Sequence, residues 1–287
     1  MSNNFNIRKN WVSSFEIMVR KPIVILPFFI IAFFEGLALE LIYFSTRRPL
    51  SFIAGPIIRK FFGEAFLHYP FNLIKLPKYF YYSQIIIYIF IGAFLTAISV
   101  NILKNIKAGL PLKANALIKN ALNRYLSFLT YGIIVVTLIF LLERVDMFVF
   151  SKSLRLISKY FPQIAPKLFL LPSALFFFLT NVIMYTFFVL TLPIIVIKKK
   201  SLLKALGESI ALGFFNFFRI FILIFPPLFL YLPITLLKAY SPVLAEKTFP
   251  GISVLIVSAG IIITIFLDCF IAVCTTQVLL AREDKII

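Results

Sequence analysis

Apolar side chains fill six long blocks of this chain, and few charged residues interrupt them. Each block approaches the roughly 20 residues that a helix needs to cross the hydrocarbon core of a bilayer. Because backbone groups in lipid must satisfy their own hydrogen bonds, each block is expected to be helical. The predicted spans are Pro22–Phe44, Phe80–Val100, Leu126–Leu142, Leu168–Val196, Ile220–Leu237 and Ile252–Leu280. The pattern therefore predicts an all-α fold, a polytopic membrane helix bundle with six transmembrane helices.

The segments before the first, third and fifth spans are amphipathic, with apolar residues on one face and basic or polar residues on the other. The apolar positions are Ile7, Trp11, Val12, Phe15, Met18 and Val19, then Leu117, Ile118, Ala121, Leu122, Tyr125, Leu126 and Leu129, then Leu202, Leu203, Leu206, Ile210 and Phe214. This spacing predicts interfacial amphipathic helices. We interpret residues 1–287 as a single membrane domain of three helix-hairpin units, 1–100, 101–196 and 197–287. Alternatively, hairpins simply need basic leading segments, with no internal repeat.

The composition agrees with a membrane protein: 61% of the residues are hydrophobic and 14% are charged. Soluble domains have about 45–50% and about 25%. The formal net charge of +18 allows nucleic-acid binding, but the basic residues lie beside the apolar blocks, where anionic lipid headgroups attract them. We therefore expect membrane lipids as partners, with another membrane protein as the alternative, and no nucleic acid. The candidates for headgroup contact are Lys113, Lys119, Arg124, Lys198, Lys199 and Lys200.

The distribution of Lys and Arg slightly favours cytoplasmic termini, because basic residues are enriched on the cytoplasmic side of membrane proteins. The first apolar block is longer than the apolar region of a cleavable signal peptide, so this helix is expected to stay in the mature protein. The prediction is a multi-pass protein of the cell (inner) membrane.

Glu35, Asn181 and Asp268 lie near the middle of their predicted spans, and no Lys or Arg is expected at the same depth. A charged side chain at the centre of a bilayer costs about 2.5–3.5 kcal/mol even on lenient scales. One hypothesis makes these residues a proton or cation site in a transport path, with Pro226-Pro227 and Pro233 breaking the fifth helix beside it. The alternative is hydrogen bonding between helices, which contributes about 0.6 kcal/mol per group.

Other chemistry has little support in the sequence. His68 is the single histidine, and its spacing of four residues from Glu64 is typical of a surface contact. Cys269 and Cys274 fall within the last span, where cysteine packs as a small apolar residue. We expect no metal site, no cofactor and no enzymatic activity.

The basic amphipathic segments Lys113–Leu129 and Lys200–Arg219 each lead into a span. In this layout the chain resembles the membrane domain joined to some bacterial glycerophosphodiester phosphodiesterases, and related six-span bacterial membrane proteins. The resemblance implies membrane association and transfers no catalytic residue. Our leading hypothesis is a non-enzymatic integral membrane protein that organises or partners with lipid or another membrane protein. The alternative is a small permease or a proton- or cation-coupled transporter that uses the intramembrane carboxylates.

Overall fold

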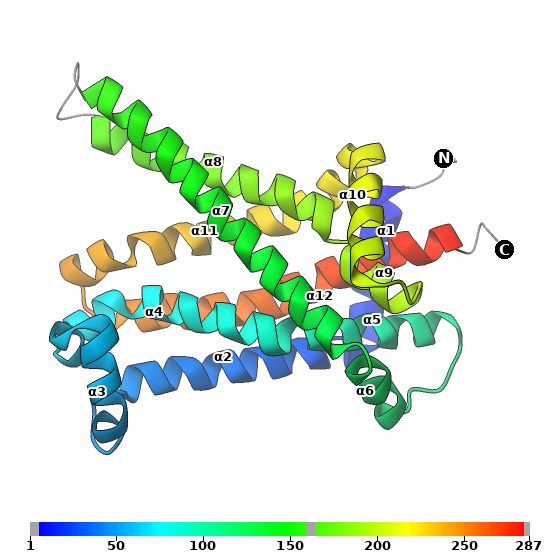
Figure 1. Ribbon diagram of the computed structural model, residues 1–287, viewed down its shortest axis with the longest axis horizontal. Helices are drawn as coiled ribbons and strands as arrows, with labels where there is room; N and C mark the ends of the chain where they lie inside the picture. Colours follow the sequence, from blue (N-terminus) through cyan, green and yellow to red (C-terminus); the bar gives the residue numbers. More distant parts are fainter. Residues whose placement is uncertain (1–5, 159–164, 284–287) are drawn as a thin grey trace.

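A computed structural model describes residues 6–158 and 165–283, and every regular element in these ranges is a helix (Figure 1). Within these described residues, six helical stretches are long and apolar enough to cross a membrane, and each overlaps one predicted span. They are Leu26–Phe44, Phe71–Lys107, Tyr125–Ser153, Pro172–Ile197, Phe217–Lys247 and Ile252–Arg282. The predicted all-α polytopic bundle is confirmed, and the chain is a multi-pass membrane protein.

The elements follow one another along the chain with short connections. They are α1 (Ile7–Arg20), the 3₁₀ helix η1 (Pro22–Val24), α2 (Leu26–Phe44), α3 (Leu50–Phe62), the 3₁₀ helix η2 (Glu64–Leu67), α4 (Phe71–Ile87), the π-helix η3 (Tyr88–Gly92), α5 (Ala93–Lys107), α6 (Ala114–Leu122), α7 (Tyr125–Ser158), α8 (Ala165–Phe188), α9 (Thr191–Ile197), α10 (Leu202–Phe215), α11 (Phe217–Lys247) and α12 (Ile252–Glu283). The second span therefore consists of α4, η3 and α5, and the fourth of α8 and α9.

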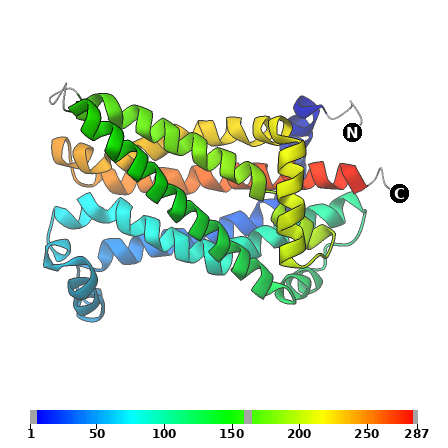
Figure 2. The same ribbon diagram turned by 45° about the horizontal axis from the view of Figure 1, so that its top comes forward.

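The short helices gather at the two ends of the bundle. Figures 1 and 2 show α1, α6, α9 and α10 at the end that also holds both termini, whereas α3 lies at the opposite end. The three helices that precede spans, α1, α6 and α10, thus share one end of the bundle. Both termini lie at this end because the described chain has an even number of candidate spans.

Helix α1 turns its small polar residues toward the bundle. Asn10 and Ser14 are buried, and the Asn10 side-chain amide donates to the carbonyl of Cys274 on α12 at 3.5 Å. The apolar residues Val12, Phe15 and Val19 point outward and keep 60% or more of their surface exposed. This outward stripe is the face that an interfacial helix presents to lipid.

Helix α11 is continuous through its prolines, so the prediction that Pro226-Pro227 and Pro233 break the fifth span is wrong. A proline has no N–H, and the carbonyl four residues earlier therefore loses its helical partner. For Pro227 that carbonyl belongs to Leu223, which accepts a hydrogen bond of 3.2 Å from the Trp11 indole nitrogen. A donor from α1 thus replaces the missing backbone bond, as the membrane interior requires.

Helix α7 crosses the π-helix at very short distance. A Cβ atom added to Gly132 of α7 would lie 3.1 Å from the Cα atom of Ile89 in η3. Gly132 therefore permits a close approach that places its neighbour Tyr131 beside Tyr88 in the centre of the bundle.

Candidate binding cavity

A cavity of about 470 Å³ lies among the helices, and residues of all six spans line it. Most lining side chains are apolar. The polar ones are Glu35, Tyr81, Gln84, Tyr88, Thr96, Tyr131, Asn181, Tyr185, Tyr231, Thr235, Thr264, Asp268 and Thr275. Small-molecule sites in proteins are clefts of roughly 300–1,000 Å³ with apolar walls and a few placed polar groups. The cavity has this size and this character.

The structure brings the three predicted intramembrane polar residues to this one cavity. Glu35 comes from α2, Asn181 from α8 and Asp268 from α12. Their hydrogen bonds in the described chain do not join them to one another. The Asn181 amide donates to the carbonyl of Phe177, one turn earlier in its own helix, at 2.8 Å. The three side chains therefore line the same cavity without bonding to one another across it.

Glu35 has two polar neighbours that the sequence did not indicate. The Gln84 side-chain amide donates to its Oε1 atom at 3.0 Å. Lys238 of α11 is close enough for its charge to act on Glu35, and the sequence did not predict this basic neighbour. The lysine lies there because α11 is longer than the predicted fifth span. Its Nζ atom donates to the Tyr231 hydroxyl at 2.9 Å and lies 5.9 Å from the centroid of the Phe80 ring.

Gly260 of α12 makes room for the Lys238 ammonium group. A Cβ atom at Gly260 would lie 2.7 Å from Cε and 2.8 Å from Nζ of the lysine. A glycine in a membrane helix usually serves close helix packing, but here the absence of a side chain at Gly260 also leaves the space that the Lys238 ammonium group occupies. Any larger residue would push this charge away from its present place.

Asp268 keeps an exposed side chain within the bundle, because it lines the cavity. Its carboxylate accepts no hydrogen bond and forms no ion pair within residues 6–158 and 165–283. Three tyrosines, Tyr88, Tyr185 and Tyr231, lie close enough to interact with its charge. Glu35 lies within electrostatic range as well. Asp268 is thus a carboxylate that has no ion pair in the described chain, in a cavity that it shares with the three tyrosines.

Tyr131 and Tyr88, which both line the cavity, are positioned by different local features. The Tyr131 side chain is 2% exposed, and its hydroxyl donates to the carbonyl of Phe188 at 3.2 Å. Tyr88 comes from the π-helix η3, whose extra residue per turn rotates the following positions relative to an α-helix. Sequence periodicity gave no signal for this element, so the inward position of Tyr88 was missed.

Arg124, one of the predicted headgroup contacts, binds backbone carbonyls. Its guanidinium donates to the carbonyls of Ile195 at 3.1 Å, Lys199 at 2.9 Å and Lys200 at 3.1 Å. These bonds satisfy carbonyls at the end of α9 and in the turn that follows, where helical partners are missing. Arg124 therefore ties the start of α7 to the connection between α9 and α10.

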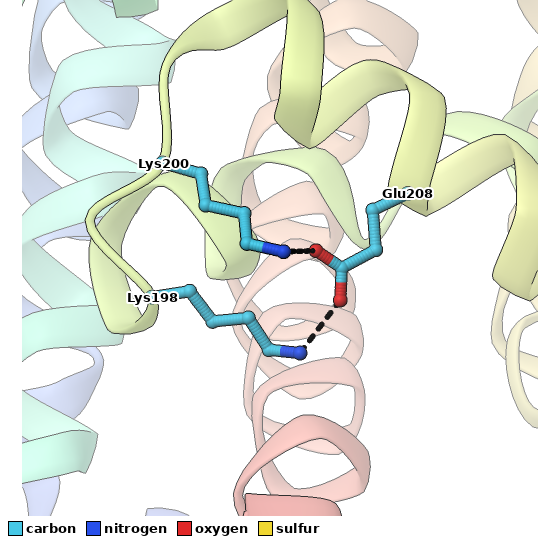
Figure 3. Close-up of polar contacts among 3 residues, drawn as sticks. All are labelled: Lys198, Lys200 and Glu208. Carbon is cyan, nitrogen blue, oxygen red and sulfur yellow. Dashed lines mark hydrogen bonds and ion pairs between the residues drawn. The ribbon is translucent and has the colours of Figure 1, made fainter.

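Lys198 and Lys200 converge on Glu208 of α10 (Figure 3). Their Nζ atoms lie 2.6 Å and 2.7 Å from the two carboxylate oxygens. Partial burial alone would raise the pKa of Glu208, but the two ammonium groups outweigh it and hold the pKa below its ordinary value. The remaining headgroup candidates, Lys113, Lys119 and Lys199, have exposed side chains.

The other candidates lie apart from the cavity. Glu64 forms an ion pair of 3.6 Å with Arg59, and His68 is exposed at the far end of the bundle. Cys269 and Cys274 are free thiols buried in the core of α12. Across the described part of the chain, no three His, Cys, Asp or Glu side chains gather in a way that suits a metal ion.

Comparison with known protein families, characterised proteins and solved structures finds no match to this chain. The resemblance to the phosphodiesterase-linked membrane domains therefore stays a prediction, and the functional argument depends on the cavity.

Proposed function

We propose that this membrane protein is a small permease that moves a solute through the central cavity, coupled to a proton or to a cation. The observation that supports this is the meeting of Glu35, Asn181 and Asp268, from three different spans, in one cavity that all six spans line. Transporters commonly place their substrate and ion sites near the middle of the membrane, between helices.

The energetic argument favours a functional cavity over hydrogen bonds that only join helices. A polar residue retained for packing would bond to a neighbouring helix, whereas Asp268 lies in the cavity without such a bond in the described chain. An unpaired intramembrane carboxylate is expensive to keep, and such residues mark ion and proton pathways.

Proteoliposomes test the proposal. Vesicles loaded with a pH-sensitive dye report proton movement when a potassium gradient and valinomycin set the membrane potential, with and without a panel of amine, sugar and amino-acid solutes. We expect protein-dependent movement that Asp268→Asn and Glu35→Gln each reduce by about tenfold or more. Glu40→Gln is the matched control, because Glu40 lies on α2 but is exposed outside the cavity. Folded variants and a parent protein that moves neither protons nor solute would refute the permease.

A separate feature, a group of exposed aromatic side chains, supports the hypothesis that the protein organises lipid or a partner protein. Phe214, Phe215 and Phe218, around the junction of α10 and α11, are 71–85% exposed. Aromatic side chains so exposed in a membrane protein contact lipid or a neighbouring protein. If this face has a specific occupant, replacing all three by leucine will reduce the lipid or protein that co-purifies with the chain. Unchanged co-purification would contradict this second proposal. Neither proposal assigns an enzymatic activity.

A further inference from the structure

The charges around the cavity do not balance. Its described lining contains two carboxylates, Glu35 and Asp268, and the nearest basic side chain is Lys238. Gln84 and Lys238 both act on Glu35, through a hydrogen bond of 3.0 Å and through charge. With both acids charged, Asp268 is left without a cation. The site therefore has a place for one positive charge that the chain itself does not supply.

The wall of the cavity favours an organic cation over a metal ion. Calcium takes six to eight oxygen ligands, and magnesium needs near-octahedral oxygen coordination. The described residues do not gather three His, Cys, Asp or Glu side chains that could hold a metal ion, and most of the cavity lining is apolar. A space of about 470 Å³ is far larger than an ion needs, but it accommodates an organic molecule of ordinary ligand size.

The aromatic side chains around Asp268 suit a substituted ammonium group. Tyr88, Tyr185 and Tyr231 are near enough to interact with its carboxylate. The face of an aromatic ring attracts cations, and rings grouped around a site are a known means of binding alkylated ammonium groups. A cavity lined by a carboxylate and by tyrosine side chains offers both a counter-charge for the nitrogen and apolar contact for the carbon atoms around it.

We propose, as a refinement that rests on the proposed permease, that the cavity binds one hydrophobic organic monocation, with its charged nitrogen between Asp268 and the tyrosines. The rest of the ligand lies along the apolar wall that α7 and α8 provide. That wall includes Val135, Val136, Ile139, Phe140, Phe178 and Val182.

Equilibrium binding to the full chain in nanodiscs of zwitterionic lipid tests this assignment. The probes are radiolabelled tetramethylammonium, benzyltrimethylammonium and benzyltributylammonium, which share one positively charged nitrogen and differ in apolar size. Neopentylbenzene, which has the shape of benzyltrimethylammonium without its charge, serves as the competitor that controls for apolar contact. We expect saturable binding of at least one of the two larger cations and weak competition by neopentylbenzene.

The variants separate charge from shape. We expect Asp268→Asn to weaken cation binding by about 10-fold to 100-fold, because it removes the counter-charge. Asp268→Glu should retain most of the affinity, and Glu40→Gln should change nothing. Tyr185→Leu should weaken the binding of cations by several-fold, about the effect expected for one cation–π contact, whereas Tyr185→Phe keeps the ring and the affinity. Gel filtration and thermal unfolding of each variant establish that it is folded.

The outcomes distinguish this inference from the permease proposal. If none of the cations binds saturably, or if folded Asp268→Asn binds them as well as the parent does, the inference is overturned. Transport of a neutral or anionic solute without cation binding would keep the permease and refute the monocation. Binding that depends on Asp268 without any flux would keep the site and refute the permease.

Discussion

Replacing Arg124 by glutamine tests whether this side chain holds the fold or contacts lipid headgroups. Its guanidinium donates to the carbonyls of Ile195, Lys199 and Lys200 and connects the start of α7 to the turn after α9. Glutamine is shorter, carries no charge and has a single donor group, so it cannot replace three bonds that fan out from one planar fork.

The expected loss follows from the exposure of the three bonds. A hydrogen bond to a charged group contributes about 1.5–3 kcal/mol, and exposed charged contacts contribute less, about 0–1 kcal/mol. The bond to Ile195 is partly buried, whereas those to Lys199 and Lys200 are exposed. We take about 1.5 kcal/mol for the partly buried bond to Ile195 and about 0.5 kcal/mol for each exposed bond, which gives a destabilisation of about 2.5 kcal/mol.

Unfolding by sodium dodecyl sulfate from bicelles measures this loss, first in zwitterionic lipid and then with anionic lipid added. We expect Arg124→Gln to lose the same free energy of unfolding in both. Lys119→Gln is the control, because it removes a charge from the same end of the bundle, and Lys119 is exposed. A headgroup contact predicts instead a loss of about 1 kcal/mol that occurs only with anionic lipid. That result for Arg124→Gln would refute the structural role.

Three further changes address single contacts, and the same bicelle unfolding measures them. Gly213→Ala should be less stable than Gly207→Ala by about 1–3 kcal/mol, because a Cβ atom at Gly213 would lie 2.7 Å from Cδ1 and 3.1 Å from Cα of Phe187. Nothing lies within 4 Å of a Cβ atom at Gly207, so equal stability of the two variants would contradict the close contact. Trp11→Phe should cost about 1 kcal/mol, because the α11 carbonyl left free by a proline loses its donor; an unchanged stability would show that this bond contributes nothing. The stabilisation from Glu208 should be present at neutral pH and be lost as pH falls through its lowered pKa, and Glu208→Gln should remove this acid dependence; a parent–variant difference that is constant down to low pH would contradict it.

The number of spans could be predicted from the sequence, but their ends could not. Block length and lack of charge identify a helix that crosses lipid, and all six predicted blocks lie on such helices. However, α4 begins at Phe71, well before the predicted Phe80, and α11 continues to Lys247 beyond Leu237. The apolar block reports the thickness of the hydrocarbon core, whereas the helix itself continues beyond the block at one or both ends.

The members of the site could be predicted only where a polar residue stood out against an apolar background. Glu35, Asn181 and Asp268 were recognisable on that basis, but their meeting in one cavity depends on the rotation of three helices, which their sequences do not fix. Gln84 and Tyr88 did not stand out in this way, and the sequence did not indicate them. The π-helix places Tyr88 in the cavity lining.

The charge asymmetry of the cavity depends on a contact that no local pattern indicates. Lys238 reaches the neighbourhood of Glu35 because α11 does not stop at its prolines and because Gly260 of α12 leaves space for the ammonium group. Were Lys238 at the headgroups, both carboxylates would lack a cation and the cavity would suit a dication. With Lys238 beside Glu35, Asp268 alone is left unpaired. The valence of the ligand that we propose is therefore set by a glycine on one helix and the length of another, and the sequence shows neither as part of a site.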